Sequence, residues 1–189
     1  MIMIYYLMGK SASGKDSIYK MLLLKNKKLQ EIAIYTTRPK RDNEVEGIEY
    51  HFVDEKYLID NENKVIEKRV YHTVYGDWYY ATLDDGNIKE NENYLMIGTL
   101  ESYVRLKKYF GENKVYPIYI EVDDKERKNR AIAREMKQKV PKLEEMERRF
   151  IEDAKDFSEE NIKSAGIIKR YQNEDLEDCV SEILKDIKQ

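Results

Sequence analysis

A short apolar run ends directly at a glycine-rich loop near the start of the chain, and this feature constrains the fold most. Residues 1–8 are rich in isoleucine and aromatic side chains, and Gly9 follows them. A run this short and continuously apolar is typical of a strand buried on both faces of a parallel sheet. Parallel strands need crossover connections, and residues 16–25 supply one, because Ile18 and Leu22 recur at helical spacing. The opening segment therefore predicts an α/β fold.

The rest of the chain continues this alternation and departs from it in two segments. Strands are predicted at 94–98, 115–122 and 167–171, and helices at 100–110 and 176–187. Residues 31–83 are rich in Tyr, Thr and Val with interspersed turn residues, which predicts short antiparallel strands. Residues 125–155 are almost entirely charged and helical in pattern, and Pro141 is expected to divide them into two helices. We expect a single domain with a core (1–33, 84–124 and 156–189), an insertion (34–83) and a helical segment (125–155).

Composition and charge exclude several classes of protein. With 189 residues, 41% hydrophobic and 38% charged, the chain suits one compact domain. A formal net charge of −3 gives no overall field that favours a nucleic acid polymer or an anionic membrane. The single Cys179 excludes an internal disulfide, and only two histidines argue against a zinc site. With neither a membrane-length apolar run nor a signal peptide in the sequence, we expect a cytoplasmic protein.

The loop after the first predicted strand matches the phosphate-binding pattern G-x-x-x-x-G-K. Its glycines let backbone N–H groups converge on phosphate oxygens, the helix N-terminus adds partial positive charge, and Lys15 can reach the β and γ phosphates. The alternative is a glycine-containing turn with a solvated lysine, which the strand before the loop and the helix after it disfavour. The predicted ATP-binding residues are Gly9, Lys10, Ser11, Ala12, Ser13, Gly14, Lys15, Asp16 and Ser17.

One position departs from this pattern. Asp16 stands where a Ser or Thr hydroxyl normally binds Mg²⁺, and Ser17 follows it. A carboxylate is an acceptable hard ligand for Mg²⁺, although it adds negative charge beside the phosphates. Asp16 would therefore bind the ion directly or through water, or Ser17 would take the role. Alternatively, Asp16 is a helix N-terminal acid that the helix dipole favours.

Together with the phosphate loop, residues 35–53 resemble guanylate kinase. They match the family pattern T-T-R-x-x-R-x-x-E-x-x-G-x-x-Y-x-F-V, and the resemblance continues at lower density to the C-terminus. It implies that Arg38, Arg41 and Tyr50 hold the phosphate of a nucleoside monophosphate and that Glu44 positions an arginine. The residue chemistry agrees, because two guanidiniums three residues apart can bind a phosphate dianion bidentately. The alternative is a set of surface charge pairs.

A second stretch resembles the part of the family that binds the base. Residues 65–67 and 76–82 are similar to F-I-E and G-x-Y-Y-G-[ST]-[ST]. The resemblance implies that Glu67 reads guanine, that Tyr79 is a second phosphate-binding phenol, and that Thr82 belongs to the acceptor site. A carboxylate suits guanine because that base presents adjacent N–H donors on one edge, and another base would leave the buried carboxylate unpaired.

The expected base pocket departs from the family pattern more than the phosphate site does. The serine before T-T-R is replaced by Ile34 or Tyr35, and Ala81 stands where a base-contacting hydroxyl is expected. The aspartates of the I-L-D-x-D strand are missing from residues 95–99. Gly98-Thr99 and the Asp-Ser pair after Lys15 instead resemble ribose 1,5-bisphosphate kinases, which lack the T-T-R run.

The charged segment 125–155 resembles the lid of nucleoside monophosphate kinases. Arg127, Arg130 and Arg134 share one helical face, and Arg149 matches a lid arginine of the family. The resemblance implies that Arg130, Arg134 and Arg149 neutralise charge on the transferring phosphoryl group when the lid closes. The alternative for each of them is a place on a solvated, salt-bridged helix.

These motifs predict a P-loop NTPase fold, with a parallel sheet flanked by helices, an inserted small mixed-β subdomain that binds the acceptor (34–83) and a helical lid (125–155). They predict an enzyme that transfers a phosphoryl group from ATP, with Mg²⁺, to GMP or dGMP. Lys15 and Arg38 are expected to act in catalysis with the lid arginines, and residues 173–176 resemble the family's N-D-D-L and are expected to cap the last helix. Expected partners are ATP and a nucleoside monophosphate, with no nucleic acid polymer and no membrane, and the protein is expected to be a monomer or homodimer. The alternatives are a kinase of a phosphosugar such as ribose 1,5-bisphosphate, and a non-catalytic guanylate-kinase-like module that binds phosphopeptides.

Overall fold

Two sheets organise the protein, whose computed structural model describes residues 2–41, 44–48, 50–73 and 76–187. The larger sheet consists of β1 (Met3–Gly9), β2 (Leu29–Glu31), β7 (Asn93–Gly98), β8 (Val115–Glu121) and β9 (Arg170–Gln172). Among the described residues these strands are all parallel, in the order β2-β7-β1-β8-β9. This parallel sheet confirms the predicted α/β class. Met1, part of the first predicted strand, lies outside the described residues.

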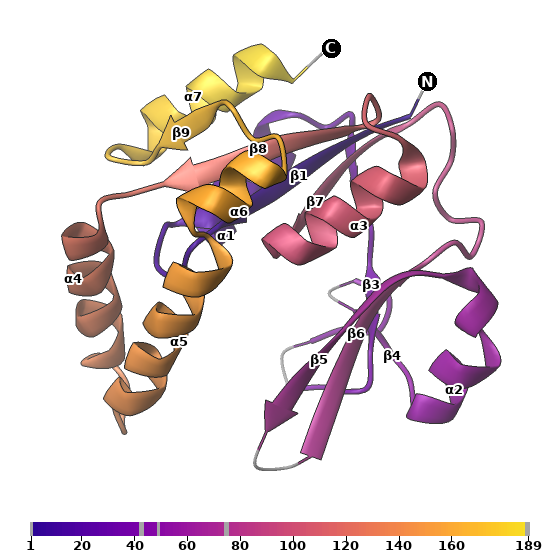
Figure 1. Cartoon of the computed structure of the whole chain (residues 1–189), viewed down its shortest axis with the longest axis horizontal. Coiled ribbons are helices and arrows are strands. Elements are labelled where there is room, and N and C mark those ends of the chain that lie inside the picture. The colour runs from indigo at the N-terminus through magenta and orange to yellow at the C-terminus, as the bar shows by residue number, and fades with distance from the viewer. Residues whose placement is uncertain (1, 42–43, 49, 74–75, 188–189) are drawn as a thin grey trace.

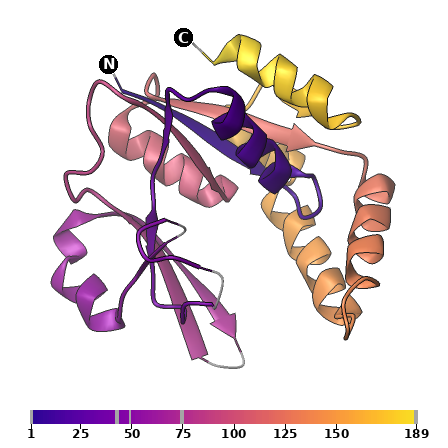
Figure 2. The same ribbon diagram turned by 180° about the vertical axis from the view of Figure 1, so that it is seen from behind.

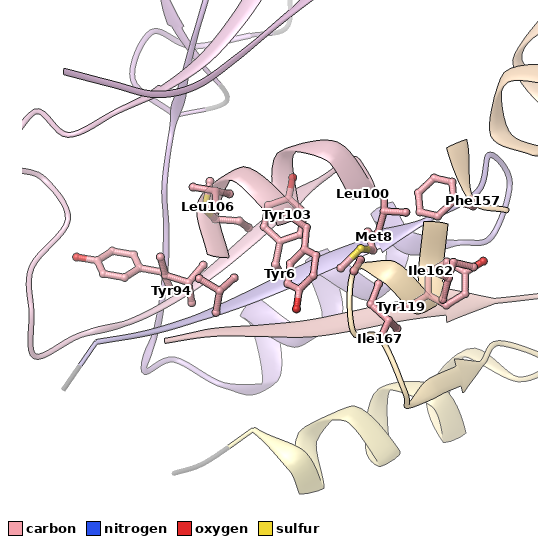
Figure 3. Packing of buried hydrophobic residues seen from close by; sticks show 14 of the residues in the cluster. Tyr6, Met8, Tyr94, Leu100, Tyr103, Leu106, Tyr119, Phe157, Ile162 and Ile167 are labelled. Carbon is pink, nitrogen blue, oxygen red and sulfur yellow. The ribbon is translucent and has the colours of Figure 1, made fainter. Parts of the chain in front are cut away.

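Helices cover both faces of the larger sheet, because alternate residues of the apolar β1 point to opposite sides. On one face Tyr5 and Leu7 pack against α1 (Lys15–Lys25) and α7 (Leu176–Asp186). On the other face Tyr6 and Met8 pack against α3 (Leu100–Phe110) and α6 (Glu159–Ser164), as Figure 3 shows. The first strand is thus buried between two layers of helices, and the phosphate loop begins at its carboxyl end (Figure 1).

The smaller sheet comes from the segment predicted as an insertion. It contains β3 (Ile34–Thr36), β4 (Tyr50–Phe52), β5 (Val65–Thr73) and β6 (Gly76–Leu83), in the order β4-β3-β6-β5. The sheet is mixed, which confirms the predicted mixed-β subdomain. Strands β3 and β4 pair in parallel, and the other two strand pairs are antiparallel, as residues 31–83 had suggested. An unexpected helix, α2 (Glu55–Asp60), and a 3-10 turn, η1 (Glu62–Lys64), precede β5. The Asp54 side chain accepts the Tyr57 N–H at 2.7 Å and so starts α2.

The charged segment forms two helices on either side of Pro141, α4 (Asp124–Glu135) and α5 (Leu143–Asp156). Lys128 Nζ and Glu147 Oε1, 2.9 Å apart, join them. Both views show these helices and the smaller sheet projecting from the same side of the core, at opposite ends (Figure 1 and Figure 2). The phosphate loop lies beside the two charged helices, because Arg127 on α4 and Asp153 on α5 contact Ser11.

One local expectation needs correction. Strand β9 is shorter than predicted, because Ile167 packs into the core cluster with α3 and α6 before the strand begins. The cap expected within residues 173–176 is confirmed, because Asp175 is the N-cap of α7 and its side chain accepts the Asp178 N–H at 3.0 Å. Within the described ranges, we find no helix with both the length and the apolar character that crossing a membrane requires.

Candidate active site

The phosphate loop joins β1 to α1 at the carboxyl end of the parallel sheet. Gly14, with φ 85°, is the N-cap residue of α1, and Ala12 has φ 60°. Left-handed residues within such a loop turn successive N–H groups toward one side, which creates a concave site for an anion. Gly9 is required by space, since a Cβ there would lie 2.7 Å from the Ile120 carbonyl oxygen. The loop therefore has the backbone shape that phosphate binding requires.

Three side chains from distant segments hold this loop. Asn173 Nδ2 donates to the Ser13 carbonyl oxygen at 2.7 Å, and Arg127 Nη1 donates to the Ser11 carbonyl oxygen at 2.8 Å. The Ser11 N–H donates to Asp153 Oδ2 at 2.6 Å. Both Asn173 and Arg127 are buried. Residues 173–176 thus cap α7 through Asp175 and also support the phosphate loop through Asn173, and Arg127 anchors α4 to that loop.

Lys15 lies among charges contributed by the loop and by the two charged helices. Burial lowers the pKa of Lys15, the carboxylates of Asp16 and Asp153 oppose that effect, and the positive charges of Arg149 and Arg134 lower the pKa further. This electrostatic coupling places Arg134 on α4 and Arg149 on α5 near the lysine. Both arginines are exposed, so their guanidiniums are available to a ligand.

Arg130 takes a different position from the other two predicted lid arginines. Its Nε donates to Glu126 Oε1 at 3.0 Å and its Nη2 donates to the Asn173 carbonyl oxygen at 3.1 Å. It lines a cavity of about 610 Å³ that also borders Lys10 and Glu174. Arg130 thus lies beside the loop, at a cavity large enough for a nucleobase, and not at the Lys15 cluster.

Asp16 and Ser17 are exposed on the first turn of α1, next to Lys15. Among the described residues, no group of three or more His, Cys, Asp and Glu side chains is arranged to hold a metal ion. An ion here would therefore take one or two oxygens from α1 and complete its shell with phosphate and water. That arrangement fits Mg²⁺, which keeps several waters and prefers carboxylate and phosphate oxygens.

The predicted binding site for the acceptor phosphate, on the smaller sheet, contains a buried guanidinium. Arg38 Nη2 and Nη1 donate to Glu44 Oε1 and Oε2 at 2.7 and 3.0 Å, and this pair holds the pKa of Glu44 below its usual range. Glu44 Oε2 also accepts the Arg41 N–H at 2.8 Å. Arg38 lies over the Tyr50 ring, 5.2 Å from its centroid, whereas the Arg41 side chain is exposed. Glu44 therefore fixes Arg38 and the backbone that carries Arg41.

The tyrosine that joins Tyr50 at the predicted binding site for the acceptor phosphate is Tyr80, and not Tyr79 as the sequence suggested. The Tyr80 hydroxyl accepts from Arg38 Nε at 3.2 Å, and its ring meets that of Tyr50 edge to face at 5.7 Å. Tyr79 points to the opposite face of β6, where it packs with Ala81 and Leu83. The physical reason is the alternation of side chains along a strand, which separates neighbouring tyrosines.

Glu67 lies further along the same face and is buried in a network of hydroxyl groups. Its Oε1 accepts from Thr82 Oγ1 and its Oε2 from Ser102 Oγ, each at 2.9 Å. Ser102 belongs to the first turn of α3, and Thr99 caps that helix by accepting the Ser102 N–H at 3.2 Å. The N-terminal end of α3 thus favours the negative charge of Glu67.

Several residues at the site had not been selected from the sequence. Ser102 and Asp153 lie in ordinary helical patterns, and only the fold brings them to Glu67 and the phosphate loop. Arg69 also lies here, because its Nη1 donates to Ser102 Oγ at 2.8 Å. Strand alternation was the one available signal, since Glu67 and Arg69 share a face of β5, and Tyr80 and Thr82 share a face of β6.

Comparisons with known proteins agree with this geometry. The sequence profile of the family described as guanylate kinase matches residues 2–189. A guanylate kinase of Bacteroides thetaiotaomicron is 34% identical over 106 residues, covering 54% of this chain and 51% of the relative. One from Legionella pneumophila (strain Lens) is 35% identical over 78 residues, covering 40% of this chain and 36% of the relative. The chain thus spans about half or less of these curated relatives.

A solved structure shares the fold over nearly the whole chain. The crystal structure of guanylate kinase from Anaplasma phagocytophilum superposes with a TM-score of 0.65 at 18% identity, covering 98% of this chain and 84% of that chain. At this identity the likeness concerns the fold alone, and the family profile over residues 2–189 carries the assignment. The chain belongs to the guanylate kinase family.

Proposed function

We propose that the protein transfers the γ-phosphoryl group of ATP to a nucleoside monophosphate, most directly GMP or dGMP. The observation that carries this proposal is the order of charge along one face of the smaller sheet. Arg38, with the exposed Arg41 beside it, forms a cationic end, and the Glu67 carboxylate lies further along. A nucleoside monophosphate has the matching order, with a phosphate dianion at one end and N–H donors on the edge of guanine at the other.

The donor phosphates would bind in the phosphate loop. Its N–H groups and the start of α1 would hold the β and γ phosphates, and Lys15 would contact the group that is transferred. Lys15 is partly desolvated beside Arg134 and Arg149, so added phosphate charge would be matched by several nearby cations. The cavity beside Arg130 and Lys10 would take the base of the donor.

Mg²⁺ would be held by Asp16, directly or through water, or by Ser17, and would neutralise charge between the donor phosphates. We propose no general base, because the attacking oxygen of the acceptor phosphate is already ionised at neutral pH. Catalysis then depends on placing two phosphates in line and on stabilising the charge that develops between them. Arg134 and Arg149 lie on helices that project across from the smaller sheet, which suits a lid closing over both substrates (Figure 1). This proposal includes the division of the chain into core, insertion and lid. It also includes a cytoplasmic location, where both substrates occur.

The test is ADP release over a panel of acceptors. With ATP and Mg²⁺, we expect turnover with GMP and dGMP to exceed turnover with AMP and UMP by more than tenfold. Absence of turnover with every nucleotide in the panel would refute the proposal. Binding of ATP measured by calorimetry separates this outcome from the third possibility, a non-catalytic module, which would bind no ATP.

A phosphosugar acceptor is the second candidate, because Asp16 and Gly98 depart from the family pattern in the same way as in the ribose 1,5-bisphosphate kinases. In the structure Gly98 lies at the Glu67 end of the acceptor face, next to Arg69. Ribose 1,5-bisphosphate is therefore included in the same panel. Turnover with it alone would favour this candidate over a nucleotide acceptor.

A further inference from the structure

We propose that Arg69 reads the 6-oxo group of a purine acceptor, so that Arg69 and Glu67 together select 6-oxopurines over 6-aminopurines. This inference rests on the proposed nucleotide acceptor. Arg69 follows Glu67 by two residues on β5, so both side chains lie on the acceptor face of the strand. Both contact the same hydroxyl, with Arg69 Nη1 at 2.8 Å and Glu67 Oε2 at 2.9 Å from Ser102 Oγ. A cation and an anion are thus held side by side in the proposed base pocket.

Gly98 makes room for this arrangement. A Cβ at position 98 would lie 2.1 Å from the Tyr6 hydroxyl and 3.0 Å from Arg69 Nη1. The strand containing Gly98 is the one in which the family pattern carries aspartates. Compared with that pattern, this pocket has lost negative charge and gained a guanidinium. The change in charge makes the pocket favour an additional hydrogen-bond acceptor on the ligand.

Arg69 has donors to offer to such an acceptor. Among the polar atoms of the described residues, its buried Nε has no hydrogen-bond partner. Burial alone would lower the pKa of Arg69, but Tyr6 and Glu67 raise it, so the guanidinium stays charged. The group also lies over the Tyr80 ring, 5.9 Å from its centroid, which orients it along the acceptor face. A buried donor without a partner is costly, and a ligand oxygen would relieve that cost.

The edge of guanine complements the pair. Its O6 acceptor stands next to the N1–H and N2–H donors, and arginine is a common partner of O6 in base recognition. With N1–H and N2–H directed at Glu67, O6 would face Arg69. Adenine has the reverse order, because its 6-amino group would meet the guanidinium and its unprotonated N1 would meet the carboxylate. Of the two residues that could stand in place of the family's serine, Ile34 has no polar group, and the Tyr35 hydroxyl donates to Asp85 Oδ2 at 2.6 Å.

The experiment compares kcat/KM for GMP, IMP and AMP in the wild type, Arg69→Ala and Arg69→Lys. IMP carries O6 and N1–H but lacks the 2-amino group, so the effect of the Arg69 variants on IMP relative to AMP reports on the contact assigned to Arg69. We expect Arg69→Ala to lower kcat/KM by about 10- to 100-fold for GMP and IMP alike, the scale of one charged hydrogen bond, and to change AMP by less than about threefold. Arg69→Lys is expected to recover part of the loss. Arg105→Ala is the matched control, because Arg105 Nη1 donates to the Lys68 carbonyl oxygen at 2.9 Å on the exposed side of the same strand.

An equal loss for all three nucleotides in Arg69→Ala would overturn the proposal, because it would show a structural role only. If that variant does not fold, Arg69→Lys decides, because a lower ratio of kcat/KM for IMP to that for AMP than in the wild type would support the proposal and an unchanged ratio would refute it. The proposed function fails in a different way, by absence of turnover with any nucleotide in the wild type.

Discussion

Replacing Glu44 by glutamine removes the negative charge that holds Arg38 in place. The two side chains share a bidentate contact, with N–O distances of 2.7 and 3.0 Å. The side chain of Arg38 is only 4% exposed and that of Glu44 is 14% exposed. In the variant, one amide oxygen can still accept a hydrogen bond, but the amide NH₂ faces a guanidinium nitrogen. Arg38 is then left buried without a counter-ion.

The size of the effect follows from this geometry. Loss of a hydrogen bond between charged groups costs about 1.5–3 kcal/mol, and breaking a fully buried ion pair costs about 3–5 kcal/mol. Because Glu44 is partly accessible to water, we expect the lower range, about 2 kcal/mol. With a typical urea dependence of about 2 kcal/mol per molar, the unfolding midpoint should fall by about 1 M.

Urea unfolding followed by tryptophan fluorescence is the assay, since Trp78, the only tryptophan of the sequence, lies on β6 of the smaller sheet. Glu62→Gln is the control, because the Glu62 side chain is exposed on η1. We expect this control to stay within about 0.5 kcal/mol of the wild type.

The pH dependence gives the effect a second signature. The contacts with Arg38 and with the Arg41 N–H lower the pKa of Glu44 in the folded state. The pair therefore stabilises the fold above the unfolded pKa of about 4.3, and that contribution is lost as the pH falls through the folded pKa. The difference between wild type and Glu44→Gln should shrink over this acidic range. Equal midpoints for the two glutamine variants at pH 7, or a difference that does not change with pH, would refute the reasoning.

Three further predictions concern the two substrate sites. Lys15→Met should lower kcat by at least about 100-fold while the thermal midpoint is kept, because the lysine stabilises transferring charge; normal turnover would contradict its role. Tyr80→Phe should raise the KM for GMP by about 2- to 10-fold through loss of its contact with Arg38, while Tyr79→Phe should leave this KM unchanged. A larger rise in KM for Tyr79→Phe than for Tyr80→Phe would restore the assignment made from the sequence. Asn173→Ala should raise the KM for ATP by about fivefold, because the 2.7 Å bond to the Ser13 carbonyl oxygen is lost; an unchanged KM would show that the loop does not need this support.

The core of the fold could be predicted from the sequence because its signals are local. The apolar first strand, the glycines of the phosphate loop and the amphipathic helix at 100–110 each depend on residues close together in the chain. The short strand β2 and the helix α2 were missed, because three and six residues carry too little periodicity to be distinguished from loops. The parallel pairing of β3 and β4 depends on a connection whose path no local pattern specifies.

The candidate site could be predicted only in part, because side-chain direction and long-range contacts complete it. The T-T-R run located Arg38 and Glu44, but the register of β6 decides that Tyr80 faces them. The contact of Arg69 with Ser102 joins residues 33 positions apart, and neither residue type suggests a site by itself. The contact between Asn173 and the phosphate loop spans 160 positions, so the resemblance of residues 173–176 to N-D-D-L indicated the helix cap but not this contact.

One of the many tyrosines of the chain, Tyr6, connects the core to the acceptor site. Its ring lies in the buried cluster beside that of Tyr103 (Figure 3), and the two ring centroids are 5.9 Å apart. Its hydroxyl reaches Ser102 and Arg69 through the space that Gly98 leaves. Burial raises the pKa of Tyr6 above its usual value, so this hydroxyl is protonated at neutral pH. A core side chain thus supplies a fixed polar contact to the guanidinium.

Tyr6→Phe separates the two contributions of this side chain. The ring and its packing remain, so the free energy of unfolding should fall by no more than about 1.5 kcal/mol, the upper value for one hydrogen bond. The guanidinium of Arg69 loses one of its supports, so kcat/KM should fall for GMP and IMP more than for AMP. Unfolding in urea and the nucleotide panel measure the two quantities on the same protein. A large loss of stability with unchanged discrimination would show that the Tyr6 hydroxyl serves the core and not the acceptor site.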